Sequence, residues 1–346
     1  MQALVLSEIG HFDLIRLQDP EPGAGEVRIA VTESGICGSE LGGFLGTDGL
    51  RHPGLVFGHE LVGAVDGYGV DVPERERLPL GTLVTANPLR PCGDCPICSA
   101  GHGNVCPQRR LLGGHVNGSN AELVVVPVTA VHRVDRLPDP TASIFAEPAA
   151  CALRAVGRTR VAAGGSALVL GAGPIGLLLI EVLRFRGVHT VLFTERVEGR
   201  AAAAEASGGV RLSDDPEVLL EQVRQRTAGL GVDAVFDAVG SDDTRVAATL
   251  AVRPGGDVCF VGLHAADATL GVRDLIRREV TCTTSFAYSP EEFADAVELL
   301  GRGKIVFRGE VVRARLDAGQ HWYEELIRGS SAGKVVLEPS HQRTGS

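Results

Sequence analysis

The sequence predicts an α/β protein in which a doubly wound parallel sheet follows a mostly β segment. From Ala3 to about Val134, short apolar runs separated by Gly, Pro and Asp indicate many short strands joined by turns. After about Ala150, apolar strands alternate with helical patterns, which is typical of βαβ units. Because these later strands are apolar along their whole length, we expect a parallel sheet that is buried on both faces.

The mostly β segment contains apolar runs that we predict as strands. They are ALVL, VRIAV, LVGAV, LVTA and AELVVVP, at residues 3–6, 27–31, 61–65, 83–86 and 121–127. In the second segment, the predicted strands lie at 166–170, 190–195, 232–240 and 257–262, and the helical patterns at 174–187, 197–208 and 242–256. The last part has amphipathic helices at 290–304 and 318–329 and a strand at 333–339, which we expect to pack on the first domain.

Length and charge restrict the classes of function. A chain of 346 residues is long enough for about two domains, each with its own core. Its net charge of −10 repels phosphate backbones and anionic lipids, so we expect neither a nucleic-acid partner nor a membrane partner. Residues 161–180 are uncharged, but their glycines and proline suit a strand–turn–helix better than a membrane span.

The first residues, MQALVLSEIG, have neither the basic region nor the long apolar region of a signal peptide, so we predict a cytoplasmic protein. Its 8 cysteines should then be reduced thiols, and clustered cysteines favour a metal site over disulfides.

Four of these cysteines form a local cluster with the spacing C-x2-C-x2-C-x7-C. They are Cys92, Cys95, Cys98 and Cys106. Zinc in structural sites takes four tetrahedral ligands, and two-residue gaps allow successive sulfurs to turn toward one ion. Since four thiolates fill the coordination shell, we predict a structural zinc that stabilises a loop.

A second set of metal-ligand residues is dispersed along the chain. Cys37 lies in GICGSE, His59 and Glu60 in GHE, and Glu147 in AEPAAC. A thiolate, an imidazole and a carboxylate together suit a zinc ion with an open coordination position. Each residue also has an ordinary structural interpretation, as a core cysteine, a structural histidine or a helix cap. Their spacing in the sequence does not by itself show that they belong to one site.

A glycine-rich turn follows the predicted strand at 166–170 and opens a helix. In Gly171-Ala-Gly173-Pro174-Ile175-Gly176, the first glycine suits the turn, the second a close approach of pyrophosphate, and the third helix–strand packing. Glu195, at the end of the next strand, is placed to accept hydrogen bonds from the adenosine ribose, which favours NAD over NADP. Arg196 and Arg200 weaken this inference, because either guanidinium could hold a 2′-phosphate.

The order of these motifs resembles the zinc-dependent medium-chain alcohol dehydrogenase family, and within it most closely the sorbitol, polyol and threonine dehydrogenase branch. The resemblance extends from Ala3 to about Pro339. It rests on the motifs GICGSE, GHE, the four-cysteine lobe, EPAACALRA, GAGPIG, GRGKI and GKVVLEP, in this order. It implies a Rossmann domain at residues 151–287 and a mostly β, GroES-like catalytic zinc domain formed by residues 1–150 and 288–346.

The resemblance also implies roles for individual residues. Cys37 and His59 would hold the catalytic zinc together with Glu60, and Glu147 would lie close enough to bind the ion or its water. Ser39 matches the residue that takes the substrate proton, and Glu40 matches the carboxylate that orients the zinc-bound histidine. Further matches to cofactor-contacting positions are Ile175, Glu195, Arg200, Val239, Val261, Gly262 and Leu263.

The expected activity is hydride transfer between a secondary alcohol and NAD(P), with one catalytic and one structural zinc ion per chain and a homodimeric or homotetrameric assembly. The substrate would be a small alcohol or ketone of the polyol, cyclitol, sugar or amino alcohol type. Two alternatives remain open at this point. One is a lyase or dismutase that keeps its cofactor tightly bound, and the other is a non-catalytic binding protein on the same fold.

Overall fold

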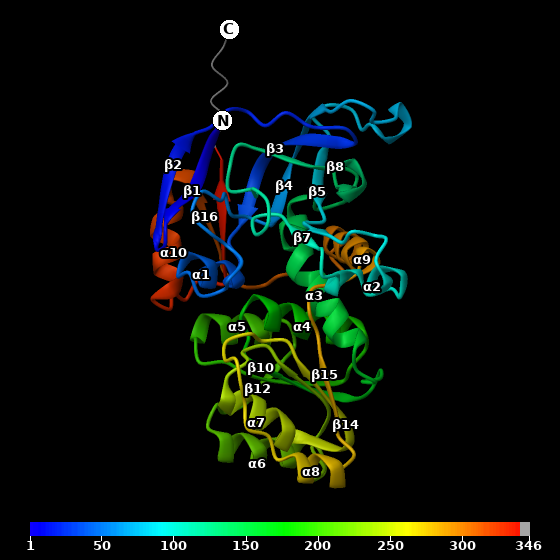
Figure 1. The fold of residues 1–346 in the computed structure, drawn as a ribbon. Helices are drawn as coiled ribbons and strands as arrows, with labels where there is room; N and C mark the ends of the chain where they lie inside the picture. Colours follow the sequence, from blue (N-terminus) through cyan, green and yellow to red (C-terminus); the bar gives the residue numbers. More distant parts are fainter. Residues whose placement is uncertain (340–346) are drawn as a thin grey trace. The chain divides into compact units, whose positions relative to one another are not determined.

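The computed structural model describes residues 1–339, which form two compact units (Figure 1). Unit 1 combines Met1–Glu147, Phe293–Gly303 and the described chain from Val311 onward. Unit 2 combines Pro148–Glu292 with Lys304–Glu310. Residues 340–346, the end of the predicted second catalytic segment, lie outside the described part.

Unit 1 is built mainly from β-strands. Its largest sheet has the order β16-β17-β3-β4-β5-β9, and β8 pairs with β3. The strands of this sheet are β3 (Glu26–Gly35), β4 (Glu60–Tyr68), β5 (Leu83–Ala86), β8 (Leu123–Pro127), β9 (Val131–Arg133), β16 (Val311–Arg315) and β17 (Lys334–Glu338). Unit 1 also contains two smaller antiparallel sheets of two strands each. One pairs β1 (Gln2–Glu8) with β2 (His11–Arg16), and the other pairs β6 (Leu89–Arg90) with β7 (Arg110–Leu111). The mostly β prediction is confirmed.

Short helices connect these strands. Those of unit 1 are α1 (Gly38–Phe44), α2 (Pro96–Ser99), α9 (Pro290–Gly301, in unit 1 from Phe293) and α10 (Gly319–Ile327), with single 3-10 turns at Glu74–Glu76, Gly103–Val105, Val128–Ala130, Thr141–Phe145 and Leu316–Ala318. Alternation along β3 explains the core of unit 1: Val27, Ile29 and Val31 are fully buried against β4 and β8, whereas the residues between them are more exposed.

Unit 2 contains a six-stranded parallel sheet of the order β12-β11-β10-β13-β14-β15. Its strands are β10 (Ser166–Leu170), β11 (Thr190–Thr194), β12 (Val210–Arg211), β13 (Val232–Asp237), β14 (Val252–Phe260) and β15 (Thr281–Thr284). This order reverses direction between β10 and β13, as in dinucleotide-binding folds. The predicted doubly wound parallel sheet is confirmed.

The helices of unit 2 are α3 (Ala146–Gly157, in this unit from Pro148), α4 (Pro174–Phe185), α5 (Glu198–Ala206), α6 (Pro216–Arg226), α7 (Asp242–Ala251) and α8 (Val272–Arg277). Local sequence fixes several of their starts. Asp215 caps α6 by accepting hydrogen bonds from the amides of Glu217 and Val218. Ser241 caps α7 in the same way, through the amide of Thr244.

Two details differ from the sequence prediction. The helical pattern predicted for 242–256 ends at Ala251, and Val252–Phe260 is strand β14. Pro254 explains this difference, because proline lacks the amide hydrogen that a helix interior requires. The structure also has β12 and α6 between Gly208 and Val232, a segment for which no element was predicted.

Among residues 1–339, no helix combines the length and the apolar composition that crossing a bilayer would require. The uncharged stretch at residues 161–180 instead contains β10, the glycine-rich turn and the first half of α4.

Candidate active site

The register between β3 and β4 brings Cys37, His59 and Glu60 together. Gly35, the last residue of β3, pairs with Glu60, the first residue of β4. Cys37 follows β3 by two residues and His59 immediately precedes β4, so both lie at the same edge of the sheet. The ligand atoms of Cys37, His59 and Glu60 lie within 4.8 Å of one another. His59 and Glu60 are buried, with exposed fractions of 2% and 1%.

Glu40 contacts the histidine of this group. Glu40 is the third residue of α1, which begins directly after Cys37. Its Oε1 lies 2.8 Å from Nδ1 of His59. The same oxygen accepts a hydrogen bond from the amide of Gly58 at 2.9 Å. Burial alone would raise the pKa of Glu40, but the His59 charge, its hydrogen bond and the nearby Arg51 lower it to about 2. Glu40 is therefore a carboxylate that can fix the orientation of the His59 ring.

The three-residue group has the chemistry of a zinc site. Burial opposes a positive charge on His59, yet the Cys37 sulfur and the Glu40 carboxylate together raise the pKa of His59 well above its usual value. The same anionic surroundings favour a divalent cation. Glu147, the fourth predicted ligand, is not one of the three, although its charge helps to raise the pKa of Lys334. The donor set of Cys37, His59 and Glu60 fits zinc.

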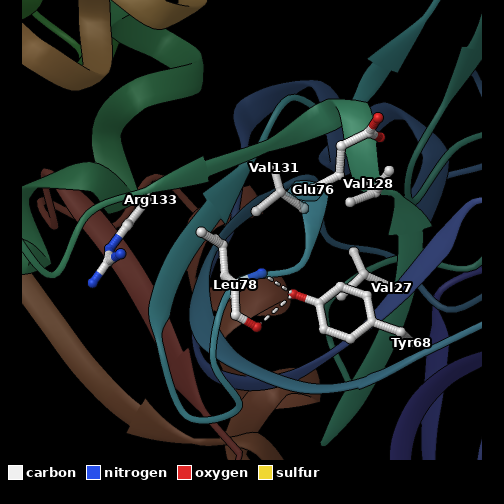
Figure 2. A pocket seen from close by; sticks show the side chains of 7 residues that line it. All are labelled: Val27, Tyr68, Glu76, Leu78, Val128, Val131 and Arg133. Atoms are coloured by element: carbon white, nitrogen blue, oxygen red, sulfur yellow. Dashed lines mark hydrogen bonds between the residues drawn. The ribbon is translucent and has the colours of Figure 1, made fainter. Parts of the chain in front are cut away.

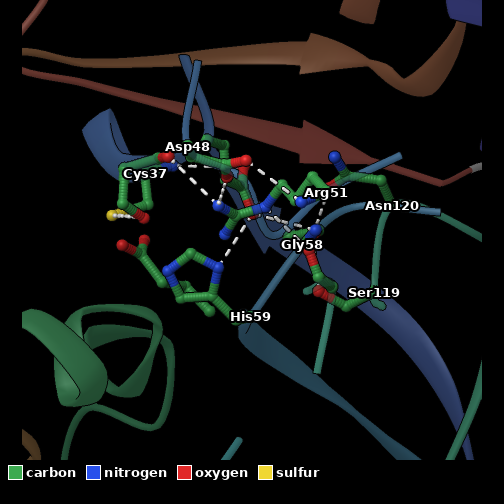
Figure 3. Close-up of polar contacts among 12 residues, drawn as sticks. Cys37, Asp48, Arg51, Gly58, His59, Ser119 and Asn120 are labelled. Atoms are coloured by element: carbon green, nitrogen blue, oxygen red, sulfur yellow. Dashed lines mark hydrogen bonds and ion pairs between the residues drawn. The ribbon is translucent and has the colours of Figure 1, made fainter. Parts of the chain in front are cut away.

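Ser39 lies beside the cysteine of this group. Its Oγ donates a hydrogen bond to Sγ of Cys37 at 3.3 Å, and its side chain is exposed. Arg51, which was not among the predicted residues, donates to the backbone carbonyl of Ser39 at 3.1 Å and to that of Gly113 at 2.9 Å. Figure 3 shows Cys37, His59 and Arg51 within one cluster of polar side chains.

Lys334 is a second residue that the sequence analysis missed. It begins β17, which pairs with β3 near Gly35, and it is 3% exposed. Its Nζ donates to Oε1 of Glu60 at 2.5 Å and also contacts Oε2. Burial lowers the pKa of Lys334, but the charges of Glu60, Cys37 and Glu147 outweigh burial and raise it. The lysine is thus a buried cation paired with a predicted zinc ligand.

The four clustered cysteines also converge. Their sulfurs lie within 4.8 Å of one another. The shortest separations are 3.4 Å for Cys106–Cys92 and 3.5 Å for Cys95–Cys98, while Cys92–Cys98 and Cys95–Cys106 are 3.8 Å apart. Four sulfurs placed tetrahedrally at the usual zinc–sulfur distance would be about 3.8 Å apart. The cluster fits a closed structural zinc site.

The glycine-rich turn has the backbone that the sequence predicts. Gly171 has a φ of +84°, a conformation that favours glycine. A Cβ at Gly176 would collide with the Gly171 carbonyl, whereas a Cβ at Gly173 would meet nothing within 4 Å. Gly176 therefore allows close helix–strand packing, and Gly173 leaves open space over the start of α4. Pro174 is the first residue of this helix and Ile175 the second.

Other predicted cofactor residues lie on loops at the carboxyl ends of neighbouring strands. Glu195 follows β11; its Oε2 accepts a hydrogen bond from the Ala172 amide of the glycine-rich turn at 2.9 Å. Val239 follows β13, and its side chain packs so closely against Gly171 that it would collide with a Cβ at that position. Gly262 packs in turn against the backbone of Val239 and Gly240. Val261 is half-buried, and Leu263 is 76% exposed. The edge where these loops meet is the usual place for a dinucleotide.

The two predicted arginines differ in what the structure shows of them. Arg196 is exposed, and its Nε lies 2.9 Å from a carboxylate oxygen of Asp214. Its backbone amide donates to Oε1 of Glu195 at 2.8 Å. Arg200 is half-buried on α5. The Arg196 side chain is thus engaged by an acidic partner, while the Glu195 carboxylate faces the glycine-rich turn.

A separate small pocket lies elsewhere in unit 1. Figure 2 shows its lining, which includes Tyr68, Leu78 and Arg133 but none of the predicted site residues. The Tyr68 hydroxyl donates to the Leu78 carbonyl at 2.9 Å and accepts from the Leu78 amide at 2.6 Å.

Comparisons with known proteins cover almost the whole chain. The sequence matches the family models "Alcohol dehydrogenase GroES-like domain" at residues 23–137 and "Zinc-binding dehydrogenase" at residues 174–302. L-galactonate-5-dehydrogenase of Escherichia coli is 31% identical over 286 residues, which are 83% of each chain. Sorbitol dehydrogenase of Halalkalibacterium halodurans is 29% identical over 350 residues, covering 98% of this chain and 99% of the relative.

A solved structure extends the likeness to three dimensions. A zinc-binding dehydrogenase of Sinorhizobium meliloti, bound to NADP, has 28% sequence identity and a TM-score of 0.89, covering 98% of this chain and 99% of that one. The GroES-like and Rossmann architecture, zinc and an NAD(P) cofactor are thereby confirmed. With its two cysteine-containing metal-ligand groups and its glycine-rich cofactor turn, this chain belongs to the zinc-dependent medium-chain alcohol dehydrogenases, in their polyol dehydrogenase-like branch.

Proposed function

We propose that this enzyme transfers a hydride between a secondary alcohol of the polyol or sugar-acid type and NAD. The observation that carries the proposal is the convergence of Cys37, His59 and Glu60 within 4.8 Å. The names of the galactonate and sorbitol dehydrogenases support this substrate class, because both proteins act on polyhydroxylated carbon chains. Cyclitols, sugars and amino alcohols remain the other substrate types to test.

The enzyme would have two zinc sites, one catalytic and one structural. Cys37, His59 and Glu60 would hold the catalytic zinc, with Glu147 as a further candidate ligand, and the four cysteines at 92, 95, 98 and 106 would hold the structural zinc. When bound at the first site, zinc supplies a Lewis acid that makes an alcohol oxygen more acidic. Glu40 would keep His59 in its ligating orientation, since its Oε1 contacts Nδ1 and leaves Nε2 for the metal.

Ser39 would accept the substrate proton. Its hydroxyl lies beside the Cys37 sulfur and is exposed, so an alcohol at the metal group could reach it. The pyrophosphate of the cofactor would bind at the glycine-rich turn, formed by Gly171, Gly173, Pro174, Ile175 and Gly176. Glu195 would bind the adenosine ribose. The remainder of the cofactor would contact Val239, Val261, Gly262 and Leu263. Arg196 and Arg200 follow Glu195, the proposed ribose ligand, by one and five residues.

The assembly, the domain boundaries and the location of the enzyme are part of the same proposal. We propose a homodimer or homotetramer in the cytoplasm, with the domains divided near residues 150 and 287. In unit 2, the outermost strand β15 is largely exposed, and Val272 and Ile276 of the preceding helix α8 are 60% and 69% exposed. A largely exposed strand at the edge of the sheet, together with exposed apolar side chains on the helix that precedes it, supports self-association.

A substrate screen tests the proposed activity. The zinc-loaded enzyme would be offered polyols, sugar acids, cyclitols, sugars and amino alcohols with NAD and NADP in parallel, and formation of reduced cofactor would be followed. We expect turnover with a polyol or sugar acid. His59→Asn should abolish it, whereas His11→Asn, at an exposed histidine of β2, should leave it intact. Turnover that survives His59→Asn, or none with any alcohol, would refute the proposal.

A further inference from the structure

The helix α10 places a buried tyrosine against the carboxylate that contacts the zinc-site histidine. Tyr323 is fully buried, and its hydroxyl donates to Oε2 of Glu40 at 2.6 Å. The other oxygen of Glu40 lies 2.8 Å from Nδ1 of His59. The three side chains thus form a continuous polar chain, Tyr323–Glu40–His59, although Tyr323 lies 283 positions after Glu40 in the sequence.

The tyrosine ring has little freedom to move. It packs among Phe12, Phe44 and Phe57, with centroid distances of 4.6, 5.6 and 6.2 Å. All three phenylalanines belong to the same buried apolar cluster as Tyr323. Because neighbouring rings restrict the Tyr323 ring, the position of its hydroxyl is fixed, and this position is next to the Glu40 carboxylate.

A buried amide fixes the hydroxyl from its other side. Nδ2 of Asn120 donates to the Tyr323 oxygen at 3.1 Å, while Oδ1 of Asn120 accepts from Oγ of Ser34 at 2.7 Å. Asn120 and Ser34 are both fully buried. Because Asn120 donates to the tyrosine oxygen, the tyrosine proton is directed to Glu40.

This arrangement uses both oxygens of the Glu40 carboxylate. Oε1 receives the Gly58 amide at 2.9 Å and faces His59, and Oε2 receives the Tyr323 hydroxyl. Oε2 also accepts a longer hydrogen bond, at 3.4 Å, from the Cys37 amide. Rotation of the carboxylate about its last bond would break the shorter hydrogen bond from Tyr323, and losing a hydrogen bond to a buried carboxylate is costly. We propose that Tyr323 is a positioning residue for the catalytic zinc, because its hydroxyl fixes Glu40 and thereby the ring of His59. This inference rests on the proposed zinc site of Cys37, His59 and Glu60.

The competing explanation is that Tyr323 is an ordinary core tyrosine whose hydroxyl needs only some partner. A matched control separates the two explanations. Tyr68 lies at the far end of β4 from Glu60, and its hydroxyl also makes two hydrogen bonds, both to Leu78 (Figure 2). Tyr68→Phe and Tyr323→Phe therefore remove the same atom and the same number of hydrogen bonds from unit 1.

The experiment measures zinc retention by the loaded enzyme against graded concentrations of a chelator. We expect Tyr323→Phe to weaken binding at the catalytic site roughly 10- to 100-fold, as loss of an outer partner of a metal-bound histidine typically does. The zinc of the four-cysteine site should be retained as in the unmodified enzyme. Tyr68→Phe should retain both ions. With cobalt in place of the catalytic zinc, Tyr323→Phe alone should change the visible absorption spectrum.

A double-mutant cycle tests whether Tyr323 acts through Glu40. If it does, the loss of zinc affinity in Tyr323→Phe/Glu40→Gln should not exceed the larger of the two single losses. Fully additive losses would overturn the proposal, as would an unchanged zinc affinity in Tyr323→Phe. If Tyr323→Phe does not fold, Asn120→Ser removes the amide donor of the hydroxyl and leaves the ring in place; equal zinc affinity in that variant would also overturn it.

The unmodified enzyme separates this inference from the proposed function. If it binds only the zinc of the four-cysteine site, the proposed catalytic site itself fails. If it binds two ions and Tyr323→Phe binds both as tightly, only the role of Tyr323 fails.

Discussion

Lys334 and Glu60 form a buried ion pair at the proposed catalytic zinc site. Nζ of Lys334 lies 2.5 Å from Oε1 of Glu60, and the two residues are 3% and 1% exposed. A buried pair of this kind owes its stability to the presence of both charges, because removing one partner leaves the other ionised and without a counter-charge in the interior. A zinc ion bound by Glu60 would be a second cation for the same carboxylate.

Lys334→Met should therefore destabilise the metal-free enzyme strongly and the zinc-loaded enzyme less. Removing one member of a buried pair typically costs about 3–5 kcal/mol, and zinc at Glu60 should offset part of that cost. The measurement is Tm with saturating zinc and after dialysis against a chelator, each relative to the unmodified enzyme under the same condition. Lys334→Arg, which keeps the charge, is the control. An equal loss of Tm under both conditions would show that Glu60 and zinc do not interact.

The Lys334–Glu60 pair also shows where prediction from sequence ends. The cysteines of the local cluster lie within 15 consecutive residues, and their spacing alone predicts that they converge. In the structure, the sulfurs of Cys92, Cys95, Cys98 and Cys106 lie within 4.8 Å of one another. The glycine-rich turn was equally local, since one strand, one turn and one helix contain all of it. Local chain geometry carries enough information for sites of this kind.

The catalytic group depends instead on strand register. Cys37 meets His59 and Glu60 because Gly35 pairs with Glu60, and no feature of the sequence specifies that pairing. The pairing of β17 with β3 brings Lys334 to this group, although it lies 274 positions after Glu60 in the sequence. A lone lysine in a sequence normally indicates a solvated surface. The resemblance to a known family supplied the catalytic group, but it supplied neither Lys334 nor the tyrosine of α10.

Metal analysis should find two zinc ions per chain, since the two ligand groups share no residue. Cys95→Ser should reduce the count to one and lower Tm or solubility before it lowers the activity of the remaining folded enzyme. Cys282→Ser, at an exposed cysteine of β15, should leave the count at two. If Cys95→Ser abolished activity without changing Tm, the structural role of the four-cysteine site would be wrong.

Cofactor preference should depend on Glu195. The carboxylate faces the glycine-rich turn, where it would repel a 2′-phosphate, so we expect a preference for NAD. Glu195→Ser should lower the ratio of kcat/KM for NAD to that for NADP roughly 10- to 100-fold, equivalent to a charged hydrogen bond of about 1.5–3 kcal/mol. Glu198→Ser, at an exposed carboxylate on α5, is the control. Equal use of both cofactors by the unmodified enzyme would assign the dominant charge to Arg196 or Arg200.

Acid stability of unit 2 should depend on Asp257. This carboxylate accepts a hydrogen bond from the Arg160 amide at 2.5 Å and pairs with the Arg160 guanidinium. Burial raises the pKa of Asp257, but the hydrogen bonds and charge of Arg160 outweigh burial and lower it below 3.8. A lowered pKa means that the carboxylate stabilises the fold above pH 3.8 and that this stabilisation is lost as the pH falls through the folded-state pKa.

Asp257→Asn should consequently cost about 1–3 kcal/mol at neutral pH. The difference in Tm between this variant and the unmodified enzyme should shrink as the pH is lowered below 3.8. Thermal unfolding across a pH series measures it, with Asp295→Asn, at an exposed position on α9, as the control. A Tm difference that is constant with pH would exclude a charge effect at Asp257.

Ser39→Ala should remove most of the oxidation rate. The Ser39 hydroxyl is exposed and lies 3.3 Å from the Cys37 sulfur, where it can take a proton from an alcohol at the metal group. Loss of a positioned proton acceptor typically costs roughly 10²- to 10⁴-fold, and we expect that loss in kcat with little change in KM, because the serine acts on the reacting proton. Steady-state kinetics with the best alcohol from the substrate screen provide the measurement.

Thr47→Ala is the matched control for Ser39→Ala. Thr47 carries an exposed hydroxyl in the segment after α1, and its Oγ1 donates to the Gly42 carbonyl at 3.2 Å rather than to a metal-ligand residue. This variant should keep nearly full kcat, and both variants should retain two zinc ions. If Ser39→Ala keeps most of its activity while Thr47→Ala behaves as expected, the proton leaves by another route. Glu60 or Glu147 would then be the next acceptor to test, because both carboxylates act on Lys334 at the metal group.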